Sequence, residues 1–378
     1  MDRTAICNVC SLRFLPQSLT MLWSLQRHWT GFETHIFVSD VTAREGATLA
    51  AAWPDVRFHF IDQFADRTIL DNALLLTDLE FNISLKAMAL RVALETGAAK
   101  ALYCDSDLLF LAAPEAALAA LDDHTVVLTP HQLSFQDDAS DFAMARTGIF
   151  NSGFIGVQGA VGLAFAQWWE DKCARYCLLE PEEGIFVDQK WLDLAVGLFP
   201  GTQAFRDPGY NLAYWNIASR GFNSQTVVVH LSGLNPARPA PAGSKLSKYS
   251  SETVDNALAQ ALVPYLKEYA EIAARISTLL PGLGVLPPFG RLAASTGPVV
   301  AKRYSAQRFM LEFENAIPRR KGRTSPAYAF QRLHRTDVAV TQLTRRLGAV
   351  LVKLGLGSVL EKFIALFRVL GRRGNWLK

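Results

Sequence analysis

The chain has 378 residues, 50% of them hydrophobic and 19% charged, so its composition excludes an intrinsically disordered protein. Its length allows one large hydrophobic core or two modest ones. The net charge of +3 conceals a split, because residues 302–378 hold 17 Lys and Arg against 4 Asp and Glu. The rest of the chain is therefore acidic, and the basic tail is expected to meet an anionic surface.

Hydrophobic patterns in the first part of the chain alternate between strand and helix. Strands are predicted at residues 4–10, 35–39 and 56–61, and helices at residues 17–28 and 43–53. Strands and helices in alternation indicate a parallel α/β arrangement with right-handed crossovers.

The α/β pattern continues to about residue 231. A helix is predicted at residues 83–96, capped by Asn82 or Ser84 and ended by Gly97. Further strands are predicted at residues 100–111, 126–128, 149–157 and 226–231, and further helices after Pro114 and at residues 163–178. Beyond residue 254 only helical patterns remain. We therefore predict an α/β domain at residues 1–250 and a helical region at residues 251–378.

The five cysteines, an odd number, argue against a disulfide framework. We expect all five to be small buried hydrophobic residues in a reducing compartment. No signal peptide is expected at the N-terminus, and no run of 18 uncharged apolar residues is present to span a bilayer. These observations predict a cytoplasmic protein.

Two carboxylates, Asp105 and Asp107, flank Ser106 where an apolar strand is interrupted. Asp is a poor strand former, so two of them at the edge of a buried strand call for an explanation. Carboxylates spaced two residues apart at a strand end can bind one hard cation, Mg²⁺ or Mn²⁺, which can in turn hold a diphosphate. Taken alone, the pattern is also typical of turns and caps.

Four further motifs accompany these carboxylates in order along the chain. Lys86 lies on the preceding helix, and Phe150-Asn-Ser-Gly-Phe154, Asp188-Gln189 and His230-Leu-Ser-Gly233 follow. This order resembles the retaining glycosyltransferases of the GT-A fold, family 8 in particular, and bacterial surface-polysaccharide glycosyltransferases. Over residues 4–250 the resemblance implies a Rossmann-like nucleotide-sugar-binding domain with a mixed, mainly parallel sheet.

The resemblance also implies a metal site. Asp105, Asp107 and His230 would coordinate one Mn²⁺ or Mg²⁺, and the imidazole shifts the preference toward Mn²⁺. The metal would stabilise the charge that develops on the departing nucleoside diphosphate. The alternative for His230 is a residue at a strand end that is satisfied by the backbone.

Other residues would contact the donor, for which the resemblance implies a UDP-linked sugar. The resemblance places Gln189 near the anomeric carbon, and Asn151 and Asp188 on the donor sugar, with Asp188 as the alternative nucleophile. The residues expected to bind the nucleotide and its phosphates are Asn8, Phe14, Asp40, Lys86, Ser106 and Lys248. Core packing of Phe14, an exposed helical Lys86 and a solvated loop position for Lys248 are the alternatives.

Aromatic and amide residues near the end of the domain would face a glycan or lipid-linked acceptor, because aromatic faces suit sugar rings. These residues are Tyr210, Asn211, Trp215 and Asn216. With eight Trp in the chain, a core position for Trp215 is the alternative.

The basic tail predicts a membrane contact. Residues 345–373 interleave Lys and Arg with an apolar stripe that repeats at helical spacing over residues 359–370. Such a helix can lie on an anionic membrane surface, here the inner face of the plasma membrane. Alternatively, the stripe packs on the α/β domain or on a second subunit.

Two other functions compete with sugar transfer. A nucleotidyltransferase that makes nucleotide sugars shares the α/β start, but its Gly-rich loop after the first strand is absent from residues 11–16. Nucleic-acid binding would rest on the basic tail, where many Leu and few aromatic residues stand among the charges. We therefore expect no nucleic-acid partner.

Overall fold

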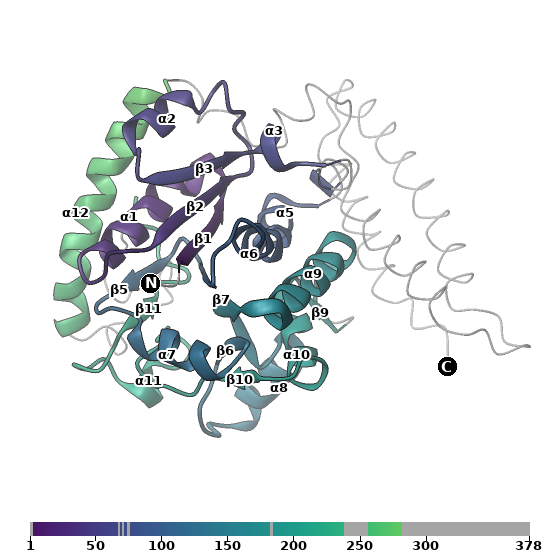
Figure 1. The fold of residues 1–378 in the computed structure, drawn as a ribbon. Helices are drawn as coiled ribbons and strands as arrows, with labels where there is room; N and C mark the ends of the chain where they lie inside the picture. Colours follow the sequence, from purple (N-terminus) through teal and green to yellow (C-terminus); the bar gives the residue numbers. More distant parts are fainter. Residues whose placement is uncertain are drawn as a thin grey trace, which may run out of the picture. The chain divides into compact units, whose positions relative to one another are not determined.

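A computed structural model describes residues 3–66, 69, 72–73, 76–181, 184–237 and 256–281. Within these residues the central sheet has seven strands in the order β10-β6-β7-β4-β1-β2-β3 (Figure 1). Its first half is parallel: β1 (Thr4–Cys10) pairs with β2 (Glu33–Val38) and β4 (Lys100–Cys104), and β2 pairs with β3 (Val56–Phe60). Every residue of β1 is buried, because helices cover both faces of the sheet.

The second half of the sheet contains one reversed strand. β7 (Phe150–Gln158) runs antiparallel to both neighbours, β4 and β6 (Val126–Pro130), and β10 (Thr202–Ala204) runs parallel to β6. The expected mixed, mainly parallel sheet is thus confirmed. Because β7 is reversed, its first residues lie at the same edge as the last residues of β4.

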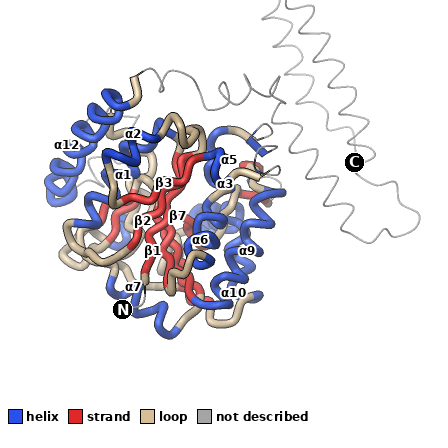
Figure 2. The backbone as a smooth tube through the Cα atoms, turned by 45° about the horizontal axis from the view of Figure 1, so that its top comes forward, coloured by secondary structure: helices blue, strands red, loops and turns tan. Residues whose placement is uncertain are grey.

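Helices form a layer on each side of the sheet. Figure 2 shows α1 (Leu15–Gln26), α2 (Ala47–Ala52) and α12 (Asn256–Leu279) on one side, and α6 (Lys86–Glu95) and α9 (Gly159–Tyr176) on the other. The other α-helices within the described ranges are α3 (Ile61–Phe64), α5 (Asp78–Ser84), α7 (Glu115–Asp123), α8 (Asp138–Thr147), α10 (Leu192–Leu198) and α11 (Ile217–Arg220). The remaining strands are β5 (Leu108–Phe110), β8 (Leu179–Glu180), β9 (Ile185–Phe186) and β11 (Val228–His230).

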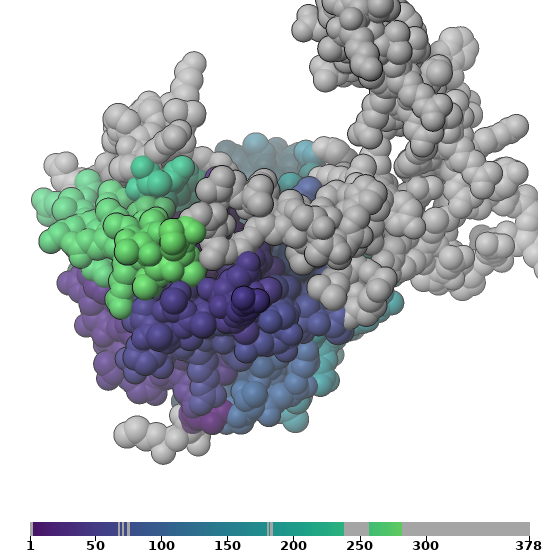
Figure 3. Space-filling model, turned by 90° about the horizontal axis from the view of Figure 1, so that it is seen from above, coloured from purple at the N-terminus to yellow at the C-terminus, as the bar shows by residue number. Residues whose placement is uncertain are grey.

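The helix α12 follows residue 250 but packs on the α/β domain, along α1 and α2 (Figure 3). Ile272 and Ile276 join the hydrophobic cluster under α1, and the Arg275 guanidinium donates to the carbonyl of Ala52 at 2.8 Å. The predicted boundary near residue 250 lies among residues outside the described ranges and stays a prediction.

Several local expectations are refined. The helix predicted at residues 83–96 is two helices, α5 and α6, which meet at Leu85. The N-cap of α5 is Thr77, whose hydroxyl and backbone form a capping box with Glu80, in place of the expected Asn82 or Ser84. All five cysteines are buried with free thiols, as predicted.

Two predictions concern segments that the structure does not describe: the membrane contact of residues 345–373 and the phosphate contact of Lys248. Among the helices that it does describe, none combines the length and the apolar character needed to cross a bilayer.

Candidate active site

A cleft of about 1170 Å³ opens at the edge of the sheet where β1 and β4 end. The chain leaves β1 toward β2 on one side and later returns to β4 on the other, so the strand order reverses between them. Such a switch point leaves a crevice at the carboxyl ends of the strands, where ligands bind in open α/β sheets. The reversed strand β7 adds its first residues to the same edge.

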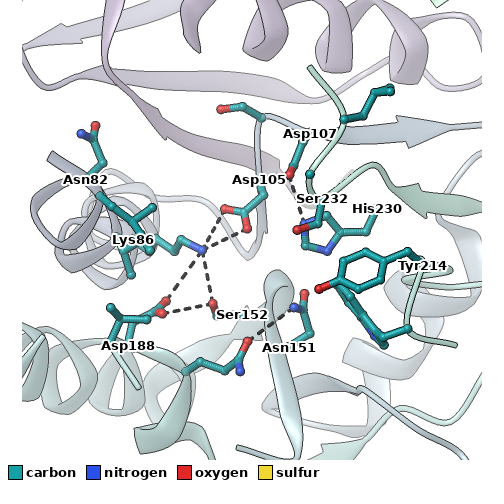
Figure 4. A pocket seen from close by; sticks show the side chains of 18 of the residues that line it. Asn82, Lys86, Asp105, Asp107, Asn151, Ser152, Asp188, Tyr214, His230 and Ser232 are labelled. Atoms are coloured by element: carbon teal, nitrogen blue, oxygen red, sulfur yellow. Dashed lines mark hydrogen bonds and ion pairs between the residues drawn. The ribbon is translucent and has the colours of Figure 1, made fainter. Parts of the chain in front are cut away.

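The metal-ligand set expected from the sequence is brought together in this cleft. Ligand atoms of Asp105, Asp107 and His230 lie within 4.8 Å of one another. The antiparallel pairing of β5 with β11 accounts for this, because it sets His230 opposite Leu108, next to the second carboxylate. Figure 4 shows the carboxylate of Asp107 and the ring of His230 facing each other, with Oδ1 3.1 Å from Nε2.

The imidazole of His230 is oriented from behind by an amide. Its Nδ1 lies 3.0 Å from Oδ1 of Asn211, a residue held at a φ of 56°. An Nδ1–H that donates to this amide oxygen leaves Nε2 as the nitrogen that faces the cleft, the arrangement typical of a metal-binding histidine. Burial lowers the pKa of His230, but the neighbouring Asp107 carboxylate outweighs burial, so the pKa is raised overall.

Gly153 leaves room for these ligands. A Cβ built on it would lie 2.7 Å from Cε1 of His230, 2.8 Å from Oδ1 of Asn151 and 2.9 Å from Oδ2 of Asp105. Its carbonyl also accepts from the backbone N–H of Asp105 at 2.8 Å, which joins β7 to the acidic motif. The backbone therefore approaches the ligand set as closely as a residue without a side chain allows.

Lys86 is buried in the cleft and is not an exposed helical lysine. Its Nζ lies 2.8 Å from Oδ1 of Asp105 and 3.8 Å from Oδ2 of Asp188, and it donates to the Ser152 hydroxyl at 3.2 Å (Figure 4). Burial lowers the pKa of Lys86, but the two carboxylates outweigh it and raise the pKa overall, so the ammonium stays charged.

Asp188 is fully buried, and the Ser152 hydroxyl donates to its Oδ1 at 3.2 Å. Burial raises the pKa of Asp188 to about 6, partly offset by Lys86. Its Oδ2 has no hydrogen-bond partner among the described residues. A buried carboxylate oxygen without such a partner is costly, and a ligand hydroxyl at the cleft would satisfy it.

Asn151 and Gln189 form a chain of amides beside this carboxylate. The Gln189 amide donates to the carbonyl of Thr147 at 2.8 Å, and its Oε1 lies 3.4 Å from Nδ2 of Asn151. The Oδ1 of Asn151 accepts in turn from the backbone N–H of Gly153 at 2.9 Å. These contacts orient both amides and leave each able to make further hydrogen bonds toward the cleft.

The residues expected to bind the nucleotide separate into two groups. Phe14 and Ser106 line the cleft, and the Phe14 ring is 47% exposed, so it is not part of the core. Asn8 lies behind the cleft and donates to the carbonyl of Cys104 at 2.7 Å. Asp40 accepts from the backbone N–H of Leu12 at 2.7 Å and thereby holds the turn that presents Phe14.

Of the four residues expected on the acceptor side, one lines the cleft and three do not. Trp215 lines the cleft, next to Tyr214. Tyr210, Asn211 and Asn216 do not line it and are each at most 1% exposed, because they pack and hydrogen-bond beneath it. Patterns of aromatic and amide residues cannot separate these positions, since both kinds occur in sugar sites and in buried turns.

Some site residues were not predicted from the sequence. Ser152 and Gly153 lie within the Asn-Ser-Gly motif, and the pairing of β7 with β4 places this motif beside Asp105. Asn211 gives no sequence signal for its contact with His230, because the contact depends on a positive φ and on the path of the following loop.

Comparisons with known proteins add the following. No family model matches the chain. A stretch of 125 residues is 33% identical to the uncharacterized protein YfnF of Bacillus subtilis (strain 168); it makes up 32% of this chain and 41% of YfnF, so the match spans less than half of that relative.

Among solved structures, the chain is similar to three glycosyltransferases. The apo-form glycosyltransferase GlyE of Streptococcus pneumoniae TIGR4 is 13% identical, with a TM-score of 0.44 over 74% of this chain and 64% of that one. The galactosyltransferase LgtC in complex with donor and acceptor sugar analogs is 14% identical, with a TM-score of 0.42 over 75% and 97%. Mouse xyloside xylosyltransferase 1 in its apo form is 13% identical, with a TM-score of 0.40 over 64% and 100%.

Proposed function

We propose that the protein is a metal-dependent glycosyltransferase that moves a sugar from a UDP-linked donor to a glycan or lipid-linked acceptor. One observation carries the proposal: a set of metal ligands and a buried polar cluster share one cleft. The ligand atoms of Asp105, Asp107 and His230 lie within 4.8 Å of one another, and Lys86 joins Asp105 to the carboxylate of Asp188.

The three ligand side chains, Asp105, Asp107 and His230, fit a divalent metal. Two carboxylates and one imidazole suit Mn²⁺ or Mg²⁺, and the lack of a side chain at Gly153 leaves room for two of these ligands, His230 and Asp105. When bound, the metal supplies Lewis-acid stabilisation of the diphosphate leaving group. Lys86 adds a buried positive charge on the same side of the cleft.

The other polar side chains would hold the donor sugar. Asp188, with a buried oxygen that accepts no hydrogen bond from the described part of the chain, would accept from sugar hydroxyls, while Asn151 and Gln189 present oriented amides. Phe14, with its half-exposed ring at the cleft, would stack on the nucleobase.

We propose transfer with retention of configuration. The bond between the anomeric carbon and the phosphate oxygen breaks, and its electron pair leaves with the diphosphate. An acceptor hydroxyl attacks the oxocarbenium-like carbon from the leaving-group side and gives its proton to a leaving phosphate oxygen. The amide of Gln189 is too weak a nucleophile for a covalent intermediate, which leaves Asp188 as the alternative nucleophile.

The acceptor is proposed to be a growing surface polysaccharide or its lipid-linked precursor, reached from the cytoplasmic side of the plasma membrane. The basic segment at residues 345–373 would supply a peripheral membrane contact. Sedimentation of the full chain with anionic liposomes at low salt tests this contact, and a chain that stays in the supernatant contradicts it.

The first experiment is hydrolysis of a panel of nucleotide sugars with Mn²⁺, Mg²⁺ or EDTA. We expect slow release of one nucleoside diphosphate, abolished by EDTA and lowered at least about 100-fold in Asp107→Ala. Asp123→Ala, at an exposed position on α7, serves as the matched control. Calorimetry with UDP and Mn²⁺ follows, and a protein that neither hydrolyses a donor nor binds UDP refutes the proposal.

A further inference from the structure

The helix α8 borders the cleft without joining the hydrophobic core. Ser140, Ala143, Met144 and Thr147 recur at helical spacing and line the cleft, yet no residue of the helix is buried. Burial of apolar surface is the main source of helix stability in proteins, so α8 gains little from it. Its position must therefore depend on polar contacts.

Polar contacts hold the C-terminal end of α8. The last carbonyls of a helix lack partners within the helix, and that end attracts positive charge. The ammonium of Lys190 donates to the carbonyl of Ala145 at 2.8 Å, and the amide of Gln189 donates to the carbonyl of Thr147 at the same distance.

Asp193 completes this arrangement. Its Oδ2 lies 2.8 Å from Nζ of Lys190, and its Oδ1 accepts from the backbone N–H of Ile149 at 2.9 Å. One oxygen thus holds Ile149, directly after Gly148, and the other holds Lys190, whose ammonium contacts Ala145 in the last turn of α8. Gly148 has a φ of 108°, and a Cβ there would lie 3.3 Å from the backbone oxygen of Gln189. The positive φ and the nearby backbone of Gln189 both favour glycine at position 148, directly after α8.

The same contacts set the orientation of the Gln189 amide. Its nitrogen must face the carbonyl of Thr147, so its oxygen faces Asn151 and the cleft. If α8 moved, the Gln189 amide would lose the Thr147 carbonyl as its hydrogen-bond acceptor. This carbonyl favours the present orientation of the amide over the one in which its oxygen and nitrogen are exchanged. Gln189, which is proposed to face the anomeric carbon, is thereby linked to the helix that borders the cleft.

We propose that Lys190 and Asp193 are positioning residues, which hold α8 in place so that its terminal carbonyl orients the amide of Gln189 toward the donor sugar. This role rests on the proposed sugar transfer.

The test compares Lys190→Met and Asp193→Asn with the wild type. Lys190→Arg, which restores the cation, is the rescue variant, and Lys267→Met, which removes the lysine of an exposed pair with Glu271 on α12, is the control. One readout is donor hydrolysis at saturating Mn²⁺. The other is the side-chain amide signal of Gln189 in protein labelled with ¹⁵N-glutamine, assigned by its loss in Gln189→Ala.

For Lys190→Met we expect the kcat of donor hydrolysis to fall about tenfold, with the donor KM changed less than about twofold. The Gln189 signal should move in Lys190→Met and Asp193→Asn, and Lys190→Arg should restore both readouts. A Gln189 signal that stays in place in a folded variant, or an unchanged kcat, overturns the role.

The two proposals fail in different ways. If the wild type hydrolyses no nucleotide sugar and binds no UDP, the proposed function fails, and the Gln189 signal alone decides whether Lys190 and Asp193 orient this amide. Should Lys190→Met not fold, Asp193→Asn decides by the same two readouts, since it keeps the size of the side chain but removes its charge and replaces one of its two acceptor oxygens with an NH₂ group.

Discussion

The ammonium of Lys86 lies 2.8 Å from Oδ1 of Asp105, which forms an ion pair inside the cleft. Lys86 is the first residue of α6, and Asp105 directly follows β4. The side chain of Lys86 is only 6% exposed, so the pair is largely removed from water. A buried charge that loses its partner is strongly destabilised, so each member constrains the other.

Replacing Lys86 should therefore impair catalysis and stability together. Lys86→Met leaves Asp105 and Asp188 without their shared cation, and we expect donor hydrolysis to fall about 100-fold. Measured by urea unfolding, the variant should also lose about 3 kcal/mol of stability. Lys100→Met is the matched control, because Lys100 pairs with Asp122 at the other end of β4. Equal losses of activity in the two variants would contradict a specific role for Lys86.

A methyl group at Gly153 should block the ligand set. Gly153→Ala would place a Cβ 2.7 to 2.9 Å from His230, Asn151 and Asp105, so one of these side chains must move. We expect Mn²⁺-dependent UDP binding, measured by calorimetry, to weaken at least about tenfold. Gly197→Ala adds the same methyl group where no atom of the described residues lies within 4 Å, and it should bind as the wild type does.

The site residues that could be predicted from the sequence are those whose environment depends on residues adjacent in the sequence. Asp105 and Asp107 interrupt an apolar strand, so their position at its end follows from the pattern of burial. The parallel first half of the sheet follows from alternating strands and helices in the same way. The approach of His230 to these carboxylates was expected only through the resemblance, because it depends on the pairing of β5 with β11.

The unpredicted parts depend on contacts between distant residues or on weak local patterns. α8 buries no side chain, so it has no apolar stripe by which to recognise it. α12 was predicted as helical, but its docking on α1 joins residues far apart in the sequence, which local patterns do not reveal. Asp40 was expected at the base or ribose, yet it accepts from Leu12, and sequence spacing does not distinguish a turn-forming carboxylate from a ligand-binding one.

The docking of α12 should contribute to the stability of the α/β domain. Ile272 is 7% exposed and packs in the cluster that includes Leu15 and Leu19 of α1. We expect Ile272→Ala to lower the free energy of unfolding by about 2 to 4 kcal/mol, measured by urea denaturation. Val263→Ala is the control on the same helix, since Val263 is 66% exposed. Similar effects of the two substitutions would show that α12 does not stabilise the domain through this face.

Asp188 should make stability depend on pH. Burial raises its pKa from 3.8 to about 6 in the folded protein, so the folded state favours the neutral acid. That contribution is fully present below pH 3.8 and is lost as the pH rises through about 6. By the linkage relation, the ionised carboxylate costs about 3 kcal/mol at pH 7.

Asp188→Asn removes this charge and should raise the free energy of unfolding by about 1 to 3 kcal/mol at pH 7, but not at pH 4. The expected gain is smaller than the full cost of the Asp188 charge, because the substitution also removes one of the two carboxylates that stabilise the buried ammonium of Lys86. Urea denaturation of both proteins between pH 4 and 7 measures the difference, with the exposed Asp123→Asn as a control that should show no such trend. A difference independent of pH would sink the prediction. If Asp188 contacts the donor sugar, Asp188→Asn should be more stable but less active, because the carboxylate that destabilises the fold is also the group that binds the sugar hydroxyls.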